Sequence, residues 1–201
     1  MALNFANNNS LSAIDTKPSG LSGGALNLIS TQTASSSATI SFTSGIDDTY
    51  DSYVFKLINI HAATDGAHLQ FQGSTDGGSS YGVTATSTFF EVAHNEADSA
   101  TALVYNGTYD LAQSTSFQSI FYSTSSDNDH AGVGVVQLFN PSSTNFVKHW
   151  TCRGQHTSTP DYSSEAYNAG YFNTTNSIDA IQFKFSSGNI DSGVIKLYGV
   201  S

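Results

Sequence analysis

The sequence predicts an all-β fold: a two-sheet antiparallel sandwich of about eight strands, jelly-roll-like, with an extended N-terminal arm. Three observations support this fold class. Short runs alternate apolar and polar residues with the period of a half-buried strand. Gly, Asn, Asp and Pro residues that favour turns separate these runs. No passage alternates strands with helices, so a doubly wound parallel sheet is not expected.

Residues 1–35 differ from the rest of the chain because their apolar residues follow no clean period. The segment contains an Asn run and one Gly pair, and it ends in a run of Ser, Thr and Gln. One interpretation is a flexible leader, and the other is an extended arm that lays its apolar side chains on a neighbouring molecule. We expect the arm over 1–35 and the sandwich over 36–201. The candidate assembly residues of the arm are Leu3, Phe5, Leu11, Ile14 and Leu21.

From Ser36 onward, the alternating runs give the expected strands in chain order. The run 133–139 is almost wholly apolar, as in a central strand. The one passage with helical character is 91–105, which predicts a short helix or a long loop. The runs expected to form strands are 38–42, 53–58, 68–72, 117–121, 133–139, 145–153, 181–185 and 195–198.

Turn chemistry fills the gaps between these runs. Asp, Asn and Gly tolerate the backbone conformations of tight turns, and Pro fixes its own φ. The Gly-rich stretch 73–81 predicts a hairpin turn, because it lacks the Gly-Lys-Ser/Thr that a phosphate-binding loop needs before a helix. Other turns are expected at 47–48, 65–66, 127–129, 140–141 and 187–189.

The composition narrows the classes of function. A chain of 201 residues fits one domain, and its single cysteine, Cys152, excludes an intrachain disulfide. The formal net charge is −10 with only six scattered Lys and Arg, so neither a nucleic-acid partner nor an anionic membrane surface is expected. The N-terminus lacks a basic region and a long apolar run, and no stretch has the length of a membrane span. We therefore expect no signal peptide and no membrane insertion.

No set of residues predicts catalysis, so the chain is expected to be no enzyme and to need no cofactor. It has no Gly-x-Ser-x-Gly elbow, and its acidic residues lie mostly in predicted turns, where they bond their own backbone. His149, Cys152 and His156 form the closest metal-like cluster, but residues 149 and 152 of one strand face opposite sides. The acidic turn 127–129 leaves a calcium site open, although it lacks the Gly and distal Glu of an EF-hand loop. No metal site is assigned.

Aromatic residues gather between 150 and 172. Buried aromatic rings would fill the core or a subunit contact, which is the commoner fate, whereas exposed rings would stack on sugars. The second interpretation gives a candidate ligand surface, which consists of Trp150, Tyr162, Tyr167 and Tyr171.

Three segments carry a resemblance when they are taken together. The first is 50–78, which includes Leu-Gln-Phe-Gln-Gly-Ser-Thr-Asp-Gly-Gly; the second is 170–183; the third is 188–200, which ends in Leu-Tyr-Gly-Val. As a set they resemble small structural proteins of marine tailed bacteriophages. The resemblance covers roughly 36–201 and implies a virion component on the head or tail surface. It implies no catalytic residues.

We therefore expect a bacteriophage virion structural protein, a capsid decoration or cement protein that assembles through its arm and its sheet faces. Its expected partners are major capsid or tail proteins and copies of itself, as a homotrimer. Such a protein is made in the host cytoplasm and reaches the virion surface without a signal peptide, because lysis releases the particle. The alternative is a tail-associated receptor- or carbohydrate-binding module that recognises a host-surface glycan.

Overall fold

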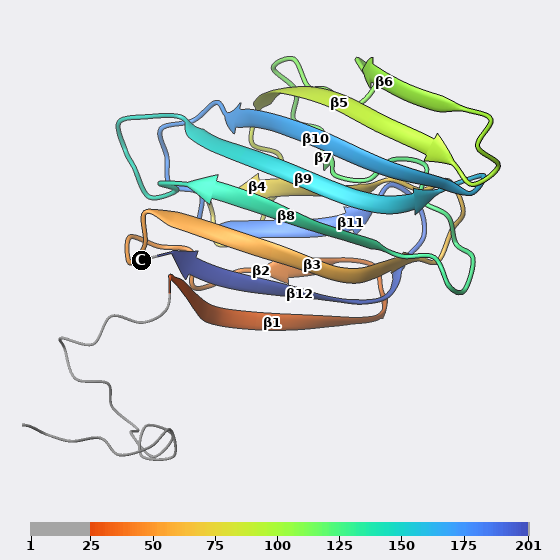
Figure 1. Cartoon of the computed structure of the whole chain (residues 1–201). Coiled ribbons are helices and arrows are strands. Elements are labelled where there is room, and N and C mark those ends of the chain that lie inside the picture. Colours follow the sequence, from red (N-terminus) through yellow and green to blue (C-terminus); the bar gives the residue numbers. More distant parts are fainter. Residues whose placement is uncertain (1–24, 201) are drawn as a thin grey trace, which may run out of the picture.

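The structure, a computed structural model, describes residues 25–200, which form β-strands and no helix (Figure 1). None of these residues therefore forms a helix long and apolar enough to cross a membrane. The strands are β1 (Leu26–Ser37), β2 (Ile40–Phe42), β3 (Ser52–Ala62), β4 (Leu69–Ser74), β5 (Ala85–Asn95), β6 (Thr101–Tyr105), β7 (Gln118–Ser119), β8 (Gly132–Phe139), β9 (Lys148–Ser158), β10 (Tyr162–Phe172), β11 (Ala180–Phe185) and β12 (Ile190–Val200).

The strands form two antiparallel sheets, which confirms the predicted sandwich. The large sheet has eight strands in the order β1-β12-β3-β8-β9-β10-β5-β6, and the small sheet has four in the order β2-β11-β4-β7. In Figure 1 the large sheet lies in front of the small one. One face of the large sheet is therefore packed against the small sheet, and its other face points away from the core. That second face is called the outer face below.

The core lies between the sheets and is rich in aromatic rings. Phe55 of β3 and Phe183 of β11 meet across it with ring centroids 5.4 Å apart, and Phe71 of β4 meets Trp150 of β9 at 5.6 Å. Both contacts are edge-to-face, a geometry that adds about 0.5–1.5 kcal/mol per pair beyond the burial of apolar area. Tyr53, Phe55 and Leu57 are all buried, as predicted for one face of 53–57, but Val54 on the other face is buried as well.

The structure has twelve strands in its described part instead of about eight, and β1 is the first of the additions. β1 begins at Leu26, so the expected sandwich boundary at Ser36 lies inside a strand, and residues 26–35 belong to the large sheet. The strand pairs with β12 from Leu26–Val200 to Ser37–Ile190. The sequence did not predict β1, because it is an edge strand with mostly exposed side chains, which need no apolar period. The arm residues Leu3, Phe5, Leu11, Ile14 and Leu21 lie outside the described residues.

The passage 91–105 is a strand hairpin, so the prediction of a helix or a long loop was wrong. β5 and β6 pair from Phe90–Tyr105 to His94–Thr101. The side chain of Asn95 organises the turn between them, since its Oδ1 accepts hydrogen bonds from the backbone N–H groups of Ser99 and Ala100, each at 2.9 Å. Such local side-chain bonds compete successfully with helix formation.

Candidate functional site

The outer face of the large sheet is an open surface with a distinct chemistry. β9 illustrates how it is built, because its residues alternate strictly between buried and exposed from Lys148 to Gln155. The buried side chains point toward the small sheet, and the exposed ones form the outer face. In Figure 1 this face is turned toward the reader, and no described strand lies over it.

Strand register brings one line of side chains together across this face, and we call it the central row. Each member lies directly opposite the next on the neighbouring strand, so the row crosses seven strands. Its members, from β12 to β6, are Lys196, Lys56, Val135, Arg153, Tyr167, Phe90 and Tyr105.

The middle of the central row is an interlocked group of charged and aromatic side chains. Arg153 forms an ion pair with Glu165, and its guanidinium lies 5.2 Å from the centre of the Tyr167 ring. On the other side of Tyr167, the ring of Phe90 is stacked nearly parallel, with centroids 4.8 Å apart. The hydrogen bond from Arg153 lowers the pKa of Glu165, because it favours the carboxylate.

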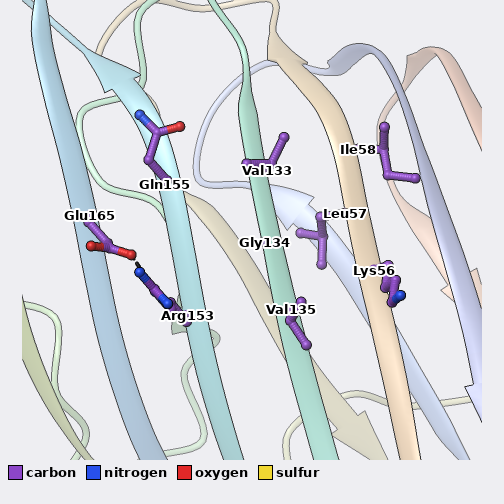
Figure 2. A pocket seen from close by; sticks show the side chains of 9 residues that line it. All are labelled: Lys56, Leu57, Ile58, Val133, Gly134, Val135, Arg153, Gln155 and Glu165. Atoms are coloured by element: carbon purple, nitrogen blue, oxygen red, sulfur yellow. Dashed lines mark hydrogen bonds and ion pairs between the residues drawn. The ribbon is translucent and has the colours of Figure 1, made fainter.

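A shallow trough of about 510 Å³ lies beside this group. Its floor is aliphatic, formed by Ile58, Val133 and Val135. Lys56 stands on one side and Arg153 on the other, where Gln155 and Glu165 also line it (Figure 2). The trough therefore offers apolar contact below and charged or amide groups at its sides.

The β5–β6 end of the outer face is apolar and uncovered. Four large apolar side chains gather there, and we call them the edge patch: Phe90, Val92, Leu103 and Tyr105. Leu103 is 72% exposed and Tyr105 is 59% exposed. β6 is also the last strand of the sheet, so one of its edges has no partner strand within the described residues.

The predicted aromatic ligand surface is not assembled as expected. Trp150 is only 1% exposed and packs inward, with its ring centroid 4.6 Å from that of Phe172. Tyr167 and Tyr171 do lie on the outer face, and Tyr162 is the half-buried first residue of β10. Residue 150 falls on the inward phase of β9, so Trp150 is a core residue, and its prediction as a ligand contact was wrong.

His149, Cys152 and His156 do not converge. His149 is exposed on the outer face, whereas Cys152 and His156 are buried in the sandwich. Burial raises the pKa of the Cys152 thiol to about 12, so it stays protonated and is a poor metal ligand or nucleophile. His156 donates a hydrogen bond from Nε2 to the Tyr122 carbonyl at 2.6 Å.

The fold brings His130 and Asp161 close to Asp127 of the acidic turn 127–129. Ligand atoms of Asp127, His130 and Asp161 lie within 4.8 Å of one another, because the start of β10 approaches the turn. Asp127 and Asp161 are exposed, and His130 Nδ1 is 3.9 Å from the Asp127 carboxylate, the distance of a loose ion pair. We assign this group no function.

The Gly-rich stretch 73–81 contains a turn, but the predicted hairpin was wrong, because β4 before it lies in the small sheet and β5 after it lies in the large sheet. The Asp76 carboxylate accepts hydrogen bonds from the Ser74 hydroxyl and from the Ser80 hydroxyl and backbone N–H. These bonds lower the pKa of Asp76 to about 2. The carboxylate therefore serves the turn itself.

Sequence reasoning missed Lys56, Arg153 and Lys196 as members of one site. They are scattered along the chain, and only the order of strands in the sheet places them side by side. Comparison with known proteins adds no further assignment: no family model, no curated protein and no solved structure matches this chain.

Proposed function

We propose that this chain is a bacteriophage virion structural protein that decorates or cements the capsid, and that it binds neighbouring subunits through the edge patch. The uncovered apolar edge at β5–β6 is the observation that carries this proposal. The virion setting is supported by the resemblance of segments 50–78, 170–183 and 188–200 to structural proteins of tailed phages.

The edge patch has the physical features of a contact surface. β6 reads Thr-Ala-Leu-Val-Tyr, with no charge, no Pro and all five residues exposed. A strand edge with unpaired backbone groups and apolar side chains pairs readily with another chain unless charged residues or Pro block it. Complete burial of a side chain such as Leu103 stabilises an interface by about 1.5–3 kcal/mol. A neighbouring subunit that covers the patch would bury these apolar side chains and so be held in place by them.

The symmetry of the proposed assembly follows from which surface meets the edge patch. Two β6 edges that pair with each other form a closed two-fold dimer, whereas a homotrimer requires the patch to meet a different surface of the next subunit. We propose the homotrimer as the decorating unit, with major capsid proteins as its further partners at the virion surface. The role proposed is structural, and no described residue is given a catalytic part.

The self-association is tested by sedimentation of L103D beside the unmodified chain. The charge should convert the oligomer into a monomer of unchanged secondary structure. F146D is the matched control, because Phe146 is 69% exposed but lies in the loop between β8 and β9. A monomeric unmodified chain, or equal dissociation of both variants, would refute assembly through the edge patch.

The virion assignment needs a separate experiment. An antibody against the purified chain should label the heads of phage particles produced from the genome that encodes it. Label on tails instead favours the second candidate, a tail-associated receptor- or carbohydrate-binding module, which the trough and the cations of the outer face support. Unlabelled particles refute both.

A further inference from the structure

Two lysines face each other on neighbouring interior strands of the large sheet. Lys56 of β3 and Lys196 of β12 are directly paired in register. Like charges in this position destabilise a sheet. Neither lysine forms an ion pair with a carboxylate of the described residues, and the ammonium of Lys56 is instead 5.3 Å from the centre of the Tyr198 ring. The repulsion between the two lysines therefore destabilises the fold locally, and no carboxylate offsets it.

The lysine pair belongs to a local excess of positive charge. Of the six Lys and Arg in the chain, Lys17 lies outside the described residues, and three of the remaining five belong to the central row. Within β3, β8, β9, β10 and the 194–200 part of β12, the outer face carries these three cations and one carboxylate, that of Glu165. This gives +3 − 1 = +2 on a protein whose net charge is −10. A concentrated patch opposite in sign to the rest of the molecule marks a surface for an anionic ligand.

The shape of the trough restricts what this ligand is. Aliphatic side chains of Ile58, Val133 and Val135 form the floor, with the cations beside it and the Gln155 amide within reach (Figure 2). Because neighbouring strands lie about 4.8 Å apart, the three cations extend over roughly 14 Å across the strands. A ligand of matching chemistry is extended, carries several negative charges, and has both apolar C–H faces and hydroxyl groups.

We infer that the cationic part of the central row, from Lys196 to Arg153, binds an acidic polysaccharide. Its carboxylate or sulfate groups contact Lys56, Lys196 and Arg153, its ring C–H faces lie on the aliphatic floor, and its hydroxyls bond to Gln155. This activity goes beyond the proposed assembly role, because it uses a different part of the outer face from the edge patch.

Other polyanions fit this surface less well. Single-stranded nucleic acids need aromatic rings with a free face for base stacking. Of the rings beside the cations, Tyr167 is covered by Phe90 on one side and by Arg153 on the other, and the Lys56 ammonium lies over the Tyr198 ring. Extended peptides commonly bind by adding a strand to a sheet edge, and β3 and β9 are both interior strands. A polysaccharide needs neither a free ring face nor a strand edge.

Binding is measured at low ionic strength by calorimetry, with polygalacturonate and dextran sulfate as probes and neutral dextran as the uncharged control. Polyglutamate and single-stranded DNA of equal charge represent the other two classes of polyanion. We expect an acidic polysaccharide to bind more tightly than either, and neutral dextran to give no signal. The double variant K56Q/K196Q should lose at least about tenfold in affinity, since hydrogen bonds to charged groups are the strongest polar contacts. K184Q, on the opposite sheet, is the matched control and should bind normally.

A second readout separates a binding role from a role in folding. In K196E a carboxylate faces Lys56, so the variant should melt at the same or a higher temperature than the unmodified chain while polysaccharide binding is lost. The inference is overturned if polyglutamate or DNA binds as tightly as the polysaccharides, if none of the probes binds, or if K56Q/K196Q binds normally. L103D should retain binding, so failure of the edge-patch proposal leaves this test intact.

Discussion

His156 makes the stability of the sandwich depend on pH. Its ring is buried and stacked on Phe121, with centroids 5.0 Å apart. Nε2 donates to the Tyr122 carbonyl, and Nδ1 is buried with no hydrogen-bond partner among the described residues. Protonation would place a charge in this apolar site and a new N–H that has no acceptor. Burial therefore lowers the pKa of His156 to about 4.

The size and direction of the effect follow from proton linkage. An unfolded histidine has a pKa of about 6.5, so between pH 6.5 and pH 4 the unfolded chain binds more protons at residue 156 than the native one. The free energy of unfolding must then fall as the pH falls through this window, by about 2 kcal/mol at pH 5 and about 3 kcal/mol once the pH is below 4. Above pH 6.5 the contribution of His156 is fully present.

Urea unfolding measured between pH 7.5 and pH 4 tests this directly, and the single tryptophan, Trp150, reports it from within the core. H156Q removes the titrating group, so its free energy of unfolding should fall about 2 kcal/mol less than that of the unmodified chain between pH 7 and pH 5. The comparison concerns the slope of the free energy of unfolding against pH, so a constant loss of packing energy in the variant does not affect it. H149Q, at an exposed position of the same strand, should keep the original slope. Equal slopes for H156Q and the unmodified chain would refute the reasoning.

Two further predictions concern Trp150 and Cys152 of β9, which the sequence analysis considered as a ligand contact and as part of a metal-like cluster. W150A should lower the free energy of unfolding by about 3–5 kcal/mol, because it leaves a cavity between Phe71 and Phe172, and an effect below 1 kcal/mol in urea unfolding would contradict burial in the core. Cys152, with its raised pKa and buried sulfur, should not react with a disulfide reagent at pH 8 until urea unfolds the chain. Rapid labelling of the native protein would show that the thiol is accessible.

The predicted fold class was confirmed where a strand has one buried and one open face. Phe183 lies between Gln182 and Lys184, and this alternation reports its burial directly. Edge strands gave no such signal. From Ser30 onward β1 is polar except for Ala34, and the hairpin residues 91–105 have side chains exposed along β6, so neither shows the period of a half-buried strand.

The candidate site was less predictable because it depends on strand order. Lys56 and Lys196 each occupy a polar position of a predicted strand, but their meeting requires β12 to lie beside β3, and no local pattern encodes that neighbour. Trp150 shows the reverse difficulty. An aromatic cluster in sequence has no fixed face, and only the phase of β9 decides that this ring packs inward.

The position of β12 in the large sheet has a consequence for synthesis of the protein. β12 is the last of the described strands to be made, yet it lies between β1 and β3, the first described strands of the same sheet. At ribosomal rates of about 5–20 residues per second, β1 waits on the order of ten seconds for the only strand it pairs with in the described fold. During that time the edge of β3 is open as well. The sheet therefore closes only after β12 has been made, and pairings so distant along the chain are slow to form. Holding chaperones, or a low rate of initiation that keeps nascent chains apart, should raise the yield of folded protein more than a change in growth temperature alone.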